Sequence, residues 1–146
     1  MIFITRHLYE GIQPDSGWER RAERQWEGRS EIYRRYYEVI SPLLPATVRR
    51  LCEHGLHDAV VEEASQRNGT LALTVDATNA IGGYRGRRLK LTFSGMRARI
   101  PTRDLRRQWW LYDEAHLSSR ANFSLHVLFN KSDVEIEADG LKIERL

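Results

Sequence analysis

The chain has 146 residues, of which 41% are hydrophobic and 29% are charged, as is typical of one ordinary globular domain. No window approaches the roughly 18 apolar residues that span a bilayer, and the apolar run at the N-terminus is too short for a secretory signal. The chain has one cysteine, Cys52, so it cannot form an internal disulfide. We interpret Cys52 as a small core residue. We therefore expect a cytoplasmic protein with no membrane association.

The first part of the chain predicts helices. Thr5 can cap a short helical turn, and apolar and aromatic residues recur at helical spacing from Trp18 onward. The Ser-Pro pair ending at Pro42 breaks this pattern, and a shorter amphipathic segment follows it. The pattern predicts a long helix over about residues 17–40 and a short helix over about residues 45–54.

The second part of the chain predicts antiparallel strands, because apolar residues alternate with polar ones after Gly55. Asn68-Gly69 and Asp139-Gly140 are both typical two-residue hairpin turns. The alternation changes phase at Gly95, which we interpret as a β-bulge inside a continuing strand.

Helices followed by strands with short connections are typical of the α+β class. We expect a single domain over residues 1–146. Its helical part, residues 1–55, would cover one face of an antiparallel meander formed by residues 56–146. This order has no internal repeat and no low-complexity tail.

The densest group of acids and histidines lies in residues 106–130, which form a predicted hairpin. Matching the apolar faces of its strands places Leu111 opposite Val127 and leaves a three-residue loop. His116 and His126 then share the outer face, offset by about four residues or on the order of 13 Å. Two ligands of one zinc ion must each lie about 2 Å from it, so we expect no metal site and no cofactor.

The same register places Trp110, Tyr112 and Glu114 on the outer face and turns Asp113 toward the apolar one. Applied to the Asn68-Gly69 hairpin, the method turns two more acids inward. The candidate catalytic residues are therefore Asp113, Asp58 and Glu62, which could line one pocket for acid–base chemistry. The structural alternatives are an ion pair with an arginine and protection of a sheet edge by inward charge.

The most charged window is residues 85–107, where nine basic residues stand against the single acid Asp104. A basic strand face beside aromatic residues could follow a nucleic-acid backbone while the aromatics stack on bases. The candidate binding residues are Arg88, Lys90, Arg97, Arg99, Trp110 and Tyr112. Glutamates on later strands could instead neutralise these cations across the sheet.

The motifs of common enzyme classes are absent: there is no P-loop, GxSxG, HExxH, CxxC pair or dinucleotide fingerprint. Most aromatic residues of the long predicted helix form its core stripe. Tyr37 falls off that stripe and, with Trp110 and Tyr112, could form the kind of exposed aromatic patch found at protein interfaces.

Four short segments resemble a small bacterial family of unknown function. They are FITRHLYEGIQ at residues 3–13, LHDA at 56–59, LTFSG at 91–95 and the closing YDEAH…FSLHVLF. The resemblance covers most of the chain and assigns no catalytic residue. The chain is also similar in style to the immunity proteins of bacterial toxin systems, which implies a binding role.

We therefore expect a non-catalytic protein-interaction module, either an immunity-type binder or a homo-oligomer. The first alternative is a nucleic-acid-binding protein that uses the basic 85–107 face. The second is a hydrolase that uses the inward acids.

Overall fold

The computed structural model describes residues 2–146 and has the predicted α+β class. The chain forms two compact units. The first ends at Pro42 and is helical, and the second spans Leu43–Leu146 and contains every strand of the described residues.

The helical unit contains α1 (Arg6–Gly11) and α2 (Glu19–Ile40). Thr5 caps α1 as predicted, because its hydroxyl accepts a 3.2 Å hydrogen bond from the Leu8 backbone N–H. The two helices contact each other, and the indole of Trp18 packs directly on the last turn of α1. A Cβ atom at Gly11 would lie 2.3 Å from that ring, so this contact requires glycine.

The second unit begins with a short 3₁₀ turn, η1 (Ser41–Leu43, shared with the first unit), and α3 (Ala46–His54). Gly55 ends α3 with φ +78°, a conformation that favours glycine. α3 contacts both β4 and β7, whose bounds are given below.

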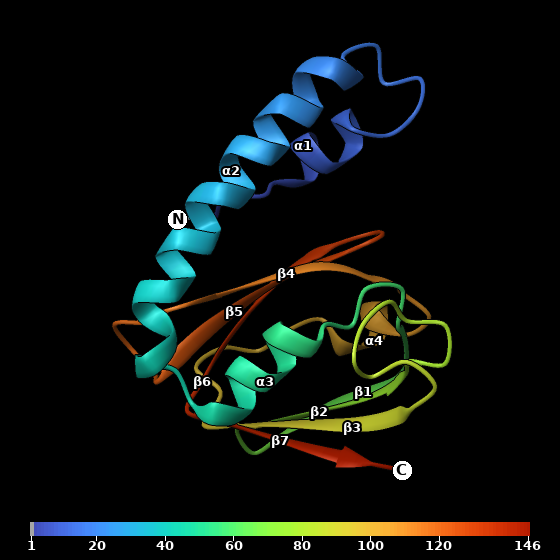
Figure 1. Ribbon diagram of the computed structural model, residues 1–146. Helices are drawn as coiled ribbons and strands as arrows, with labels where there is room; N and C mark the ends of the chain where they lie inside the picture. Colours follow the sequence, from blue (N-terminus) through green and yellow to red (C-terminus); the bar gives the residue numbers. More distant parts are fainter. Residues whose placement is uncertain (1) are drawn as a thin grey trace. The chain divides into compact units, whose positions relative to one another are not determined.

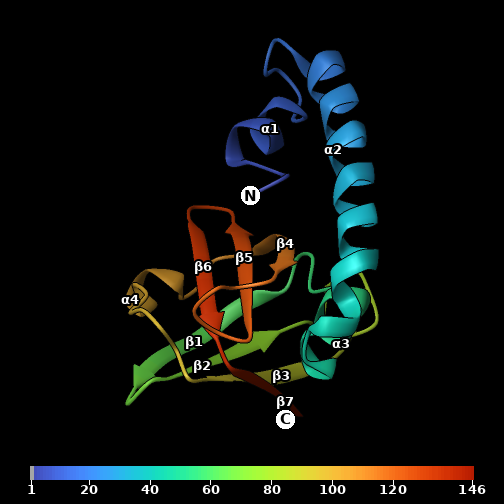
Figure 2. The same cartoon turned by 90° about the vertical axis from the view of Figure 1, so that its left-hand side faces the viewer.

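Two antiparallel sheets make up the rest of the unit (Figures 1 and 2). The larger has the order β1-β2-β3-β7 and the smaller has the order β4-β5-β6. The strands are β1 (Val60–Arg67), β2 (Thr70–Asp76), β3 (Arg88–Ser94), β4 (Trp110–His116), β5 (Phe123–Phe129), β6 (Asp133–Ala138) and β7 (Gly140–Arg145), and a short helix, α4 (Thr102–Leu105), precedes β4.

Two turn predictions about these strands are wrong. Asp139-Gly140 does not close a hairpin, because β6 pairs with β5 whereas β7 crosses to the other sheet and pairs with β3. Gly95 is not a bulge inside a strand, because β3 ends at Ser94. Gly95 has φ +66° and turns the chain into a loop over residues 95–101.

The core lies between the two sheets, where the ring centroids of Phe93 and Phe123 are 6.4 Å apart. Every residue of β5 is buried, so this central strand has no solvent-exposed face. A strand with one exposed face is expected to alternate buried and exposed residues, and β5 departs from this pattern.

Candidate functional site

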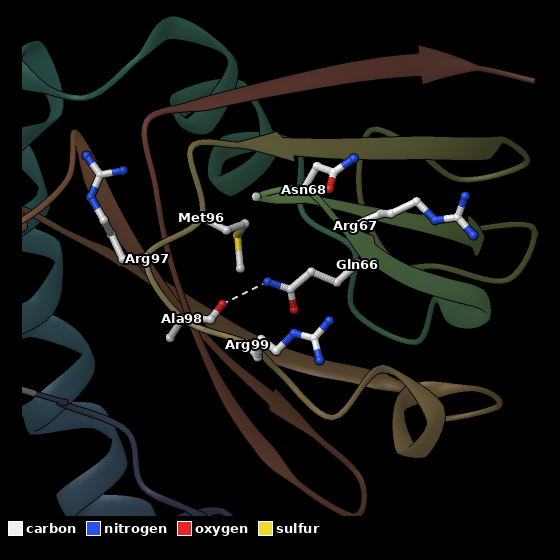
Figure 3. A pocket seen from close by; sticks show the side chains of 8 residues that line it. Gln66, Arg67, Asn68, Met96, Arg97, Ala98 and Arg99 are labelled. Atoms are coloured by element: carbon white, nitrogen blue, oxygen red, sulfur yellow. Dashed lines mark hydrogen bonds between the residues drawn. The ribbon is translucent and has the colours of Figure 1, made fainter.

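A polar hollow of about 220 Å³ lies where the β1–β2 turn meets the loop that follows β3 (Figure 3). Its walls come from two short segments, residues 66–69 of the hairpin and residues 96–99 of the loop. The lining residues are Gln66, Arg67, Asn68, Gly69, Met96, Arg97, Ala98 and Arg99. Three of these eight residues are arginines, so the hollow is basic.

Local backbone chemistry forms the hairpin side of the hollow. Asn68 and Gly69 have φ +51° and +74°, the left-handed pair that a tight two-residue turn requires. Ala64 pairs with Leu73 in this hairpin. The Gly69 carbonyl accepts a hydrogen bond from the Met96 N–H, which joins the loop to the turn.

The side chain of Gln66 fixes the loop side. Its Nε2 donates a 2.8 Å hydrogen bond to the Ala98 carbonyl, and its Oε1 accepts a 2.9 Å bond from the Ile100 N–H. One amide thus satisfies two backbone groups of a segment that has no secondary structure of its own. The positions of residues 97 and 99 relative to β1 are set by this clamp.

The three arginines differ in their partners. Arg97 is neutralised by the Asp139 carboxylate at 2.8 Å and also donates to the carbonyls of Gly95 and Arg120. In Figure 3 its guanidinium points away from Gln66. Arg67 and Arg99 are exposed, and none of residues 2–146 forms an ion pair with either side chain.

The other candidate binding residues do not join this hollow. Arg88 forms a 2.6 Å ion pair with Glu62, and Lys90 is exposed with Glu144 as its cross-strand neighbour on β7. Trp110 is completely buried, so the prediction that it faces outward is wrong. Tyr112 is partly buried, and burial raises the pKa of its hydroxyl.

The register of β4 and β5 differs from the predicted one by two residues, which changes the residues that lie opposite each other but not the face on which each side chain lies. Glu114 pairs with His126 and Asp113 with Val127, whereas matching apolar faces predicted Leu111 opposite Val127. An irregularity between Trp110 and Tyr112 shifts the start of β4. The loop between the strands is therefore longer than predicted.

The register brings Glu114, His116 and His126 close together on a buried face. His116 Nε2 lies 3.0 Å from Glu114 Oε2, and His126 is directly opposite Glu114. The two histidines are thus offset by two residues instead of four. All three are buried, which contradicts the prediction of an exposed outer face. Burial lowers the pKa of His126. Within residues 2–146, no group of three His, Cys, Asp or Glu side chains could hold a metal ion.

Asp113 has unusual partners for a carboxylate. Its Oδ2 accepts a 2.8 Å hydrogen bond from the Trp110 indole N–H, and the Cys52 thiol of α3 donates to the same group. Burial raises the pKa of Asp113 to about 6, against the opposing effect of these two donors. The same surroundings raise the pKa of Cys52 well above its usual value.

The two other inward acids have different surroundings from those predicted. A bulge between Val61 and Glu63 moves Glu62 off the inward face. The Glu62 carboxylate forms an ion pair with Arg88 instead. Asp58 has φ +69° and lies 3.6 Å from His57 Nε2, with about a third of its side chain exposed. The predicted orientation of Glu62 is therefore wrong. The contacts of Asp113, Asp58 and Glu62 involve different partner residues.

The sequence matches the model of a family described as a protein of unknown function (DUF4085) over residues 10–138. The chain belongs to this family. The match agrees with the resemblance to an uncharacterised family noted in the sequence. No curated protein and no solved structure matches this family member. Among the described residues, no helix combines the length and hydrophobicity needed to cross a membrane.

Proposed function

We propose that this protein is a non-catalytic binding module that docks an acidic partner protein at the Arg67–Arg99 hollow. The observation that carries the proposal is the pair of exposed guanidiniums at the hollow, one from the β1–β2 hairpin and one from the loop that Gln66 holds. A guanidinium binds a carboxylate through two parallel hydrogen bonds, and these charge-assisted bonds are among the strongest on protein surfaces.

Arg67 and Arg99 differ from three other arginines of this unit, which are already paired with carboxylates of the same chain. Arg88, Arg97 and Arg120 each form an ion pair of 2.6–2.8 Å with a carboxylate of the same chain. A partner would have to displace those carboxylates to use the three arginines. Arg67 and Arg99 need no such displacement, so they can contribute fully to an interface.

The Gln66 clamp supports binding because it orders the loop before a partner arrives. Ordering a flexible loop on association costs free energy that would otherwise appear as affinity. Two hydrogen bonds from one side chain already hold residues 98 and 100. The hollow therefore has the character of a preformed site.

An acidic protein fits the hollow better than a nucleic acid does. Binding a single strand requires aromatic rings on which bases stack, and the two aromatic candidates, Trp110 and Tyr112, are buried and partly buried. Acids such as Glu62 also interrupt the basic surface. A hollow of about 220 Å³ suits one acidic side chain inserted from a partner.

The chemistry around Asp113 supports a non-catalytic role. A reactive cysteine needs a lowered pKa, whereas the pKa of Cys52 is raised by burial and by the adjacent carboxylate. The Trp110 indole is a donor with no acid–base function at ordinary pH. These neighbours satisfy the carboxyl group of Asp113 and provide no general acid–base partner.

The proposal is tested by the binding of a short glutamate-rich peptide, measured by fluorescence anisotropy at about 50 mM salt, where screening is modest. The Arg67→Ala/Arg99→Ala variant should bind at least about tenfold more weakly, the loss of one or two charge-assisted bonds. The matched control, Arg20→Ala/Arg24→Ala, removes the same charge from exposed positions of α2 and should bind like the wild type.

Two outcomes would count against the proposal. Equal weakening in both double variants would mean that the peptide responds only to net charge. Tighter binding of a single-stranded DNA oligonucleotide than of the peptide, abolished by the same Arg67→Ala/Arg99→Ala variant, would assign the hollow to nucleic acid.

A further inference from the structure

β7 is an edge strand whose outer side is unpaired in the second unit. It is last in the order β1-β2-β3-β7, and only β3 pairs with it among the described strands. Figures 1 and 2 both show it as the outermost strand of the larger sheet, with no strand beyond it. Such an edge presents a row of backbone donors and acceptors to another chain.

The hydrogen-bond pattern identifies which backbone groups point outward. The Leu146 N–H donates to the Arg88 carbonyl, and these residues continue the pairing of Leu89 with Arg145. In an antiparallel ladder such hydrogen-bonded pairs alternate with non-hydrogen-bonded ones. The even-numbered residues of β7 therefore bond to β3, and residues 141, 143 and 145 point their N–H and C=O groups outward.

The outward residues of β7 have no other backbone partner. Among residues 2–146, no backbone hydrogen bond to another segment involves Leu141, Ile143 or Arg145. α3 contacts β7, but no backbone hydrogen bond joins them. The free edge thus has three consecutive outward positions, the length of a short ladder.

The side chains of the alternate positions select a particular partner. Lys142 and Glu144 lie on one face of β7, with Lys142 Nζ 3.2 Å from Glu144 Oε1. Their side chains remain 71% and 41% exposed, so both are available to a second strand. A Lys and a Glu two residues apart form a self-complementary pattern for an antiparallel copy of the same strand.

We propose that β7 pairs antiparallel with β7 of a second copy of this chain, about a two-fold axis at Ile143. This register places Ile143 opposite the Ile143 of the second copy and joins outward residues only to outward residues. It also sets each Lys142 opposite the Glu144 of the other copy, in the closer non-hydrogen-bonded pairs. The two larger sheets then become one continuous sheet.

The neighbouring registers that also join outward residues are disfavoured by charge. Shifting one copy by two residues sets Lys142 against Lys142, and shifting it the other way sets Glu144 against Glu144. Like charges directly opposite each other destabilise a pair of strands. Charge therefore selects the register centred on Ile143.

The pairing is expected to be weak. Two short strands bury less surface than the roughly 1,200 Å² of a stable standard interface. The dissociation constant of the dimer should accordingly be tens to hundreds of micromolar. This corresponds to a free energy of association on the order of −5 to −6 kcal/mol. Sedimentation velocity over about 5–500 µM covers this range.

Charge exchange gives the decisive experiment. Lys142→Glu and Glu144→Lys should each be monomeric throughout, because each sets like charges opposite each other in the two-fold pair. An equimolar mixture of the two variants should form a heterodimer, since every cross-strand pair is then Lys–Glu. The double variant, which exchanges both residues, should recover the wild-type dimer.

A backbone variant provides an independent measurement. Ile143→Pro removes an outward N–H that β3 does not use, so it should abolish dimers while retaining the monomer's melting temperature to within a few degrees. Hydrogen exchange at the Ile143 amide of the wild type should slow at high concentration. If Ile143→Pro unfolds, the charge variants still decide the question.

The competing explanation is that Lys142 protects the edge from any pairing. In that case the wild type, the single variants and their mixture would all sediment as monomers up to about 500 µM. That result would overturn the proposal. A wild-type dimer that persists unchanged in both single variants would also overturn it, because the interface would then lie elsewhere.

Discussion

The indole N–H of Trp110 donates a 2.8 Å hydrogen bond to the carboxylate of Asp113, three residues along the same strand. The bond links the largest fully buried side chain of the protein to a carboxyl group with a raised pKa. A second donor, the Cys52 thiol, comes from α3. Two weakly polar donors, the Trp110 indole and the Cys52 thiol, therefore satisfy the carboxyl group of Asp113. The sequence had suggested an arginine as its structural partner.

This relationship predicts how stability depends on pH. The pKa of Asp113 is about 6 in the folded protein, against about 3.9 in an unfolded chain. The unfolded chain therefore loses this proton first as the pH rises, and the free energy of unfolding falls between about pH 4 and pH 6. The loss amounts to about 3 kcal/mol and persists at higher pH.

Asp113→Asn should remove that loss because an amide does not ionise. The variant should be about 1–3 kcal/mol more stable than the wild type at pH 8, and the difference should vanish near pH 4. Urea unfolding at several pH values measures this. Asp104→Asn, at an exposed position of α4, is the control for the substitution of an aspartate by an amide. A destabilised Asp113→Asn protein at pH 8 would contradict the interpretation.

Trp110→Phe should destabilise the protein by about 1–3 kcal/mol, since it removes the donor from a buried acceptor. It should also raise the pKa of Asp113 further, because the Trp110 bond lowers that pKa. Carboxyl NMR shifts of Asp113 follow the titration. The matched control is Trp109→Phe, because Trp109 is 51% exposed and adjacent in sequence. Equal effects of both substitutions on the titration would refute the assigned bond.

Gly95→Ala should destabilise the protein by about 1–3 kcal/mol. The residue has φ +66°, and an added Cβ would lie 2.4 Å from Oδ2 of Asp139. The same carboxylate binds Arg97 through its other oxygen. Gly28→Ala is the control, because Gly28 lies within α2 with open space around it. Thermal unfolding should show Gly28→Ala to be more stable than the wild type by up to about 1 kcal/mol.

Gln66→Ala should release the loop over residues 96–100 with a loss of about 1–2 kcal/mol in stability. The Gln66 side chain holds the Ala98 carbonyl and the Ile100 N–H, so the Ala98–Ile100 segment should exchange its amide hydrogens faster. Peptide binding should weaken as well, although no arginine is removed. Unchanged exchange in this loop would show that the clamp is not what orders it.

The sequence was sufficient to predict much of the fold. Thr5 as a helix cap, the two helices that begin near residues 17 and 45, and the Asn68-Gly69 turn depend on local chemistry and are confirmed. Asp139-Gly140 has an equally strong local turn signal, but its following strand pairs with β3. Long-range pairing overrode the local preference there.

The candidate site was only partly predictable. Arg97 and Arg99 belong to the basic window, but Gln66 and Arg67 come from the β1–β2 hairpin on the other side of the hollow and carry no sequence signal of their own. The register of β4 and β5 was inferred from matching apolar faces, which assumes one exposed face. β5 is buried on both sides, so that assumption could not locate Glu114 correctly.

The most direct test of the central claim is where an acidic peptide binds. In ¹H–¹⁵N NMR spectra of the full chain titrated with the glutamate-rich peptide, the largest shifts should fall on residues 66–69 and 96–99. These shifts should disappear in the Arg67→Ala/Arg99→Ala variant and persist in Arg20→Ala/Arg24→Ala. Shifts spread over all exposed arginines, or centred on a different surface, would contradict the assignment of the hollow as the docking site.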